Sequence, residues 1–79
     1  QMYIGSVFTY NDHKIKVVMS YNTIIGFIVD SKKLITWGYR TYSRTTSKQI
    51  TQLVYDYDLR LHKVNIYGME LESLNYYLE

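Results

Sequence analysis

Apolar and polar side chains alternate through the first half of the chain, a period of two that is typical of β-strands. The alternation is clearest from Ile15 through Val17 to Met19, which share one face. The same rule places Ile4 and Phe8 on one face of the first run. The third β-type run, residues 23–30, is apolar at successive positions, which predicts a strand covered on both sides. Four strands are predicted, at residues 3–10, 13–21, 23–30 and 34–42.

Short polar segments separate the four predicted strands. Asn11-Asp12 is a turn dipeptide between two β-type runs, and Asn22 and residues 30–33 mark the next two turns. Connections as short as these join neighbouring antiparallel strands. The first half of the chain therefore predicts an antiparallel meander.

A helical pattern follows the fourth predicted strand. Thr46 is followed three residues later by Gln49, a spacing that fits a capping box and places the helix start there. Arg60 and His62 then lie near the helix end, where cations complement the helix dipole. One apolar stripe recurs at helical spacing through Ile50, Leu53, Val54, Tyr57 and Leu61.

The end of the chain predicts two further elements. Residues 63–67 read as a fifth strand, and residues 69–78 as a short terminal helix or, alternatively, an extension of that strand. The predicted fold class is α+β: an antiparallel β-meander of about four strands packed by one helix, then a fifth strand and a short terminal helix. The leucines on one side of the terminal helix are Leu71, Leu74 and Leu78.

Composition narrows the class of protein. Seventy-nine residues predict a single domain, residues 1–79. The absence of cysteine excludes disulfides, thiolate nucleophiles and cysteine metal sites. Ten tyrosines suit a binding surface, because tyrosine gives contact area at low entropic cost, although a coding bias explains the count equally well. The chain shows no signal-peptide pattern and no apolar stretch of membrane-spanning length, so we expect a cytoplasmic protein without a membrane partner.

The charge distribution is more informative than the net charge of +2. Residues 31–48 carry five cations and no acid, whereas acids outnumber cations from residue 49 onward. This asymmetry predicts one basic and one acidic part of the surface. The five cations are Lys32, Lys33, Arg40, Arg44 and Lys48.

The segment that joins the fourth strand to the helix is the main candidate site. A hydroxyl-rich, basic turn at a helix start can hold a phosphate or carboxylate, because backbone N–H groups and cations converge there. The alternative is an ordinary helix cap surrounded by solvated cations. The candidate residues for binding a partner or an anion are Arg40, Tyr42, Arg44, Thr46, Ser47 and Lys48.

Aromatic residues give a second group of candidates. Trp37 and Tyr39 share one face of the predicted fourth strand, either as core residues or as a platform for bases or a protein partner. Tyr76 and Tyr77 are candidate contacts with a partner or with a second copy of the chain. The alternative for them is a terminal element that folds back onto the sheet.

No residues for catalysis can be assigned. His13 and His62 belong to no metal-ligand spacing, so neither a metal nor a cofactor is expected. Asp56 and Asp58 are two residues apart on the predicted helix, which points them to different sides. The chain is therefore predicted not to be an enzyme.

Two motifs carry a resemblance to a known group of proteins. They are Ser20-Tyr21-Asn22-Thr23-Ile24-Ile25-Gly26 and Tyr42-Ser43-Arg44-Thr45-Thr46-Ser47-Lys48-Gln49. Together they resemble short phage and mobile-element proteins of low-GC Gram-positive bacteria, with the pattern S-Y-x-T-x-I-A followed by Y-S-x-T-T-S-K-H. The match spans about half the chain and departs at Gly26 and Gln49, where the pattern has Ala and His. The resemblance implies a phage-like setting in a bacterial host and brings no activity.

Three functional hypotheses follow. The leading one is an accessory protein that binds and modulates a host protein, such as an inhibitor of a CRISPR-type defence nuclease. The second is nucleic-acid binding through the basic and aromatic strand-turn-helix surface. The third is a structural homo-oligomer, a homodimer in its simplest form.

Overall fold

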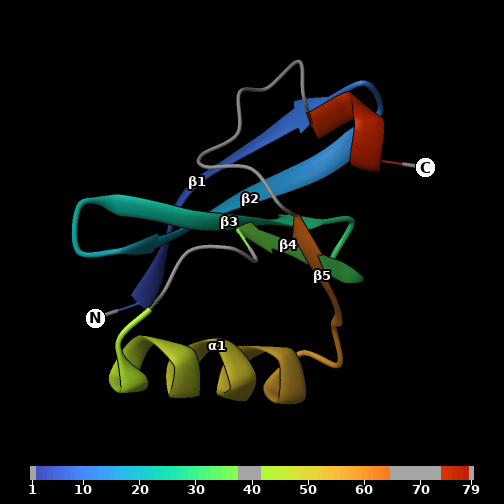
Figure 1. The fold of residues 1–79 in the computed structure, drawn as a ribbon. Coiled ribbons are helices and arrows are strands. Elements are labelled where there is room, and N and C mark those ends of the chain that lie inside the picture. Colours follow the sequence, from blue (N-terminus) through green and yellow to red (C-terminus); the bar gives the residue numbers. More distant parts are fainter. Residues whose placement is uncertain (1, 38–41, 65–73, 79) are drawn as a thin grey trace.

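Five strands form one mixed sheet in the order β1-β2-β3-β4-β5 in the computed structural model (Figure 1), which describes residues 2–37, 42–64 and 74–78. The first four strands are an antiparallel meander, as predicted, and β5 lies parallel to β4. Helix α1 (Arg44–Asp56) connects β4 to β5, so the fold class is α+β. The elements are β1 (Met2–Tyr10), β2 (His13–Ser20), β3 (Thr23–Val29), β4 (Lys33–Trp37), α1 (Arg44–Asp56), β5 (Arg60–Val64) and the 3₁₀ turn η1 (Asn75–Tyr77).

The sheet is covered on both faces, which confirms the prediction for the third strand. Helix α1 lies against one face and the C-terminal turn against the other (Figure 1). In the second half of β3 the residues alternate: Ile28 packs with the helix side and Phe27 with the opposite side. A register shift against β2, between Val18 and Met19, breaks the alternation, so Ile25 also packs with the helix side. The helix-side core is Val18, Ile25, Ile28, Leu34, Ile50 and Leu59. The opposite core is Ile15, Val17, Phe27, Val29, Ile35, Val64, Leu74 and Leu78.

The predicted facing of the first strand is wrong at one end. The register between β1 and β2 shifts by one residue at Gly5, which is a β-bulge. Ile4 therefore lies opposite Val18 on the helix side, whereas Phe8 lies opposite Ile15 on the other side. One extra residue reverses the alternation, so Ile4 and Phe8 do not share a face.

The predicted turns are confirmed, with one change of residue. Asn11 and Asp12 have φ values of 49° and 67°, as a type I′ hairpin turn requires. Asp30 and Ser31 also adopt positive φ. In the turn between β2 and β3, Tyr21 takes the left-handed conformation, with φ of 56°.

Helix α1 begins three residues before the predicted start. Ser43 is the N-cap residue, and its hydroxyl oxygen accepts the Thr46 N–H at 3.1 Å. Thr46 therefore occupies the third helical position instead of capping the helix with Gln49 as partner. Both hydroxyl residues stand near the end of a β-type run, and the sequence pattern alone does not separate them.

The predicted C-terminal end of the helix is also wrong. The helix ends at Asp56, and Asp58 adopts a φ of 52° that turns the chain back toward the sheet. Pairing with β4 then takes the next residues into β5, which begins at Arg60 instead of residue 63. His62 is thus a strand residue, not a cation at a helix end.

The remaining predictions fall partly outside the described residues. Strand β4 ends at Trp37, and the rest of the predicted fourth strand lies outside them up to residue 41. Residues 65–73 of the predicted strand and terminal helix are outside as well. In the described end of the chain, η1 is a single 3₁₀ turn, and Leu74 and Leu78 on either side of it are buried.

Candidate functional site

Three predicted site residues lie together on the outer side of α1. Arg44, Ser47 and Lys48 are exposed and recur at three- and four-residue spacing, which places them on one side of the helix. The stripe continues toward the C-terminal end of the helix and lines a shallow depression. We call this surface the outer stripe; it consists of Arg44, Ser47, Lys48, Thr51, Gln52 and Tyr55.

The two cations of the outer stripe are available to a partner. Within the described part of the chain, neither Arg44 nor Lys48 forms an ion pair; the pair found there joins His13 and Asp30. The first turn of α1 contains no acid to offset the positive end of the helix dipole. The outer stripe is therefore electropositive at its N-terminal end.

Tyr55 gives the outer stripe an aromatic contact. Its side chain is 82% exposed. The Gln52 amide beside it donates a hydrogen bond to Asp56 Oδ1 at 2.7 Å. Tyrosine and arginine are enriched at the centres of protein interfaces, because they combine large contact area with polar groups. An exposed tyrosine about two turns from Lys48 and about three turns from Arg44 is suited to bind an acidic protein surface together with these cations.

Two other predicted site residues, Tyr42 and Thr46, lie on the inner side of the helix start. Tyr42 is half-buried against the helix-side core, and its hydroxyl lies 3.5 Å from the Ile25 carbonyl oxygen. Both line a second pocket, between the start of α1 and the turn that joins β2 to β3. The predicted site is thus divided by the helix into an outer and an inner part. The residues opposite Tyr42 and Thr46, which the site prediction missed, are Ser20, Tyr21 and Thr23.

The predicted aromatic strand surface lies mostly outside the described residues. Tyr39 and Arg40 fall in the range 38–41, and the side chain of Trp37 is likewise not described. The roles proposed for these three residues remain predictions.

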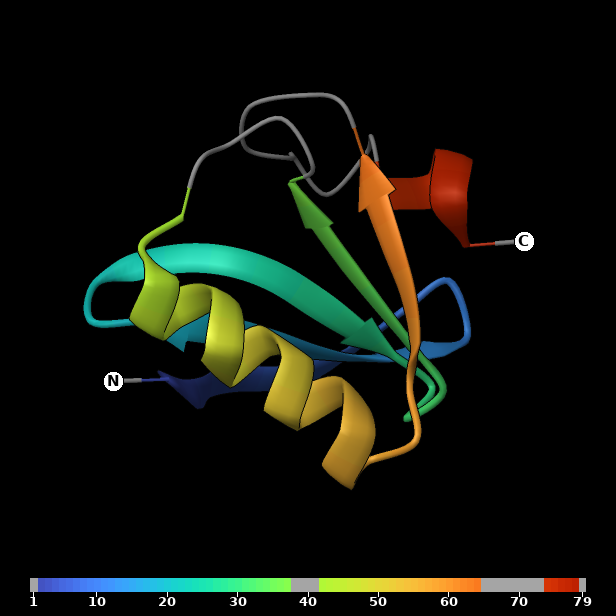
Figure 2. The same cartoon turned by 60° about the horizontal axis from the view of Figure 1, so that its bottom comes forward.

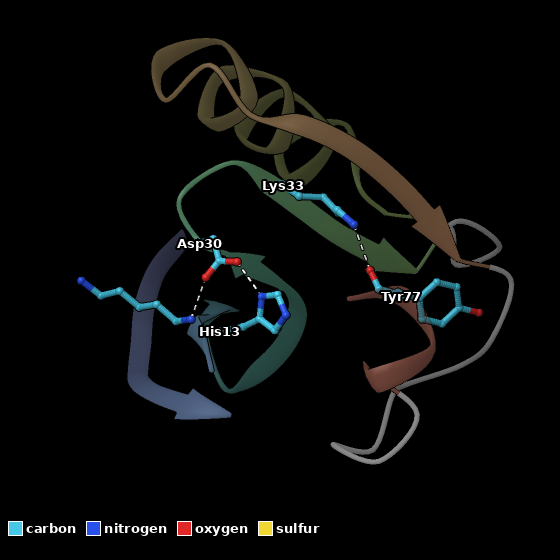
Figure 3. A network of polar contacts seen from close by, with 5 residues as sticks. His13, Asp30, Lys33 and Tyr77 are labelled. Atoms are coloured by element: carbon cyan, nitrogen blue, oxygen red, sulfur yellow. Dashed lines mark hydrogen bonds and ion pairs between the residues drawn. The ribbon is translucent and has the colours of Figure 1, made fainter. Parts of the chain in front are cut away.

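The C-terminal tyrosines have different environments. Tyr76 is 85% exposed, whereas Tyr77 packs against the core on the side of the sheet opposite α1. The Tyr77 ring lies 5.5 Å from the His62 ring, between ring centroids. The Lys33 ammonium group donates to the Tyr77 carbonyl oxygen at 2.9 Å (Figure 3). Tyr77 therefore helps to fix the C-terminal turn, and Tyr76 is the member of the pair that a partner can reach.

A polar clamp joins the start of β2 to the end of β3. His13 Nδ1 lies 2.6 Å from Asp30 Oδ2, and the Lys14 backbone N–H donates to Asp30 Oδ1 at 2.9 Å (Figure 3). The His13 hydrogen bond, followed by the Lys14 N–H, lowers the pKa of Asp30 below its ordinary value of 3.8. The partner of His13 could not be predicted from the sequence, because the contact forms only when β2 and β3 pair. We interpret this clamp as structural.

The described cations do not form one continuous face. Arg44 and Lys48 lie on the outer side of α1, while Lys33 points to the C-terminal turn across the sheet from the helix. In the same described ranges, no three histidine or acidic side chains gather where they could hold a metal ion.

Comparison with known proteins places the chain in a family. None of the helices in the described residues is long and apolar enough to cross a membrane. Neither the curated proteins nor the solved structures contain a match to this sequence. The model of one family, described as a family of unknown function (DUF8033), matches residues 1–71. With nine-tenths of its length matched, the chain belongs to the DUF8033 family.

Proposed function

We propose that this protein is a non-enzymatic binding protein whose outer stripe docks onto an acidic surface of a partner protein. The observation that carries the proposal is the unpaired state of Arg44 and Lys48, on one helix face with the exposed ring of Tyr55. Complementary charge guides such an encounter, and the desolvated ring supplies affinity. The sequence resemblance suggests the setting: a phage-type accessory protein that modulates a host protein in the bacterial cytoplasm, for example a defence nuclease.

A pull-down with charge-reversed bait tests the proposal. The immobilised protein is incubated with a lysate of a Gram-positive host, beside the double variant Arg44→Glu, Lys48→Glu. A control with the same change of charge, Lys14→Glu with Lys63→Glu, places it on exposed strand positions outside the outer stripe. We expect the wild type and the control to retain the same host protein, and the outer-stripe variant to lose it, because reversed charges repel an acidic surface.

Two outcomes of this pull-down contradict the proposal. One is retention of the same protein by the outer-stripe variant. The other is recovery of nothing by the wild type at micromolar bait.

Nucleic-acid binding is the alternative use of the same cations. It predicts affinity for labelled oligonucleotides that falls steeply as salt rises, since each phosphate contact releases counterions. The division of the described cations between two sides of the sheet favours a protein partner. The test measures the fluorescence anisotropy of a labelled oligonucleotide at low salt. A rise with the wild type that is absent with the outer-stripe variant would show that the partner is nucleic acid and not protein.

Self-association is a second candidate function, favoured by the outer edge of β1. No strand among the described residues pairs with that edge. Strand β1 is nine residues long and contains no charged residue. Its side chains Tyr3, Ile4 and Val7 are 44%, 41% and 55% exposed. Natural sheets usually protect such edges with charge, so a long neutral edge is a template for pairing with a second copy.

A further inference from the structure

The pocket on the inner side of the helix start has a distinctive lining. Six of its seven described lining residues carry a hydroxyl group, and none of them is charged. It has a volume of about 290 Å³ and lies between the turn that joins β2 to β3 and the start of α1, which are neighbours in Figure 2. We call it the hydroxyl pocket. It is separate from the outer stripe, whose residues line another depression.

The sheet side of the hydroxyl pocket contributes two hydroxyl groups. Ser20 pairs with Thr23 across β2 and β3, so their side chains share a face. Ser20 is only 9% exposed, and among the described residues its hydroxyl has no hydrogen-bond partner. No side-chain oxygen in the described part of the chain is both sealed from solvent and unpaired. The Ser20 hydroxyl therefore opens into the pocket that Ser20 lines.

The helix side contributes a third donor and a positive field. The Ser43 hydroxyl accepts the Thr46 N–H and donates to Thr46 Oγ1, both at 3.1 Å. Thr46 Oγ1 acts as the acceptor in that contact, so its own proton is left for another acceptor. The N-terminal end of α1 carries the partial positive charge of the helix dipole, and its first turn holds Arg44 and no acid.

We infer that the hydroxyl pocket binds a phosphate group. A tetrahedral phosphate presents acceptor oxygens in several directions, and the donors Ser20, Thr23 and Thr46 approach from two sides. The helix terminus adds the charge complementarity that anions find at such ends. The exposed ring of Tyr21 at the rim offers an apolar surface to the organic part of a phosphate monoester. A carboxylate has fewer acceptor positions and matches this arrangement less well.

A titration followed by ¹H–¹⁵N NMR tests the inference. Inorganic phosphate, adenosine monophosphate and acetate are added separately at constant ionic strength, with chloride as the reference. We expect saturable shifts of the Ser20, Thr23 and Thr46 amides with phosphate and weaker effects with acetate. Tighter binding of the monophosphate identifies a monoester as the ligand, and equal affinities identify free phosphate; both results support the pocket.

Variants then locate the bound group. Ser20→Ala with Thr23→Val is expected to weaken phosphate binding by about tenfold or more, because hydrogen bonds to a charged ligand are lost. Ser47→Ala is the matched control, since it removes a hydroxyl from the outer stripe instead. Equal affinity in the pocket variant, shifts no larger than those with chloride, or equal binding of acetate would each overturn the inference.

A second measurement uses the wild-type protein alone and so does not depend on the folding of the pocket variant. Phosphate that binds the folded state raises the melting temperature of the wild-type protein above that in chloride. Absence of this rise at millimolar phosphate also counts against the pocket. None of these results bears on the outer stripe, whose pull-down is read out separately.

Discussion

Gly26 of β3 lies where a side chain would have no room beside the β4 backbone. A Cβ atom at this position would lie 2.4 Å from the Ile35 carbonyl oxygen, which is part of the β4 backbone. At Gly5, in the bulge of β1, a Cβ atom would meet the Met19 side chain at 2.6 Å instead. Relief at Gly5 needs a new rotamer of Met19, because the contact is with its Cγ atom, whereas relief at Gly26 needs the paired β4 backbone to move. The departure of Gly26 from the alanine of the resembled pattern therefore has a steric reason in this chain.

We predict different costs for alanine at these two glycines. Gly26→Ala forces β3 and β4 apart and should lower the free energy of unfolding by about 1–3 kcal/mol, as overpacking in a core does. Gly5→Ala should cost clearly less. Urea denaturation of both variants beside the wild type measures the difference. A Gly26→Ala protein as stable as the wild type would show that the two strands do not approach as described.

Asp30 gives a prediction about pH. Because its pKa is lowered in the folded state, its contribution to stability is complete above the ordinary value of 3.8 and is lost as pH falls through the folded value. The wild type should therefore lose stability more steeply under acid than Asp30→Asn, in which this titration is absent. Asparagine tolerates the positive φ of residue 30, so the turn is retained.

Urea midpoints measured from neutral pH down to about pH 3 provide the comparison. Asp12→Asn is the matched control, since Asp12 is an exposed turn residue with positive φ. Parallel pH curves for the wild type and Asp30→Asn would contradict the role of the clamp.

At the scale of elements, the predictions succeeded where structure is local. The first three strands and their turns follow from alternation and turn residues, because neighbouring antiparallel strands need no distant information. The prediction of the C-terminal end of α1 failed for a different reason. Leu61 continues the helical spacing of Leu53 and Val54, but the left-handed conformation of Asp58 and the pairing of β5 with β4 end the helix earlier. That pairing joins residues far apart in the sequence, which a local pattern does not encode.

The candidate site was predictable to the same extent. Arg44 and Lys48 stood out as cations at a helix start, and helical spacing from Arg44 reaches Tyr55 without further information. Ser20 and Thr23 lie on other elements than Thr46, so the hydroxyl pocket forms only after the helix packs on the sheet. Sequence reasoning thus located the cations of the outer stripe and the helix side of the hydroxyl pocket. It missed the contacts between elements.

At the scale of the whole molecule, the two edges of the sheet differ. Strand β5 carries Arg60 and Lys63, charges that discourage pairing with another chain. Strand β1 has no such protection. If self-association occurs, we predict that it joins two β1 edges and that light scattering at high micromolar concentration gives twice the mass of one chain.

A lysine in β1 tests this prediction. Val7→Lys places a charge on an exposed edge position and should return the protein to the mass of a monomer. Asn22→Lys adds the same charge at an exposed turn and should leave the dimer intact. A wild-type mass equal to one chain at every concentration would exclude self-association, and a dimer that survives Val7→Lys would place the contact elsewhere.

The outer stripe is the central claim, and the most direct measurement compares two exposed tyrosines against the captured partner. Tyr55 lies on the outer stripe, while Tyr57 is 62% exposed at the helix end and outside it. Calorimetry should show that Tyr55→Ala weakens binding by about tenfold or more, as loss of an interface hot spot does, and that Tyr57→Ala binds like the wild type. Equal affinity of Tyr55→Ala and wild type would contradict the account.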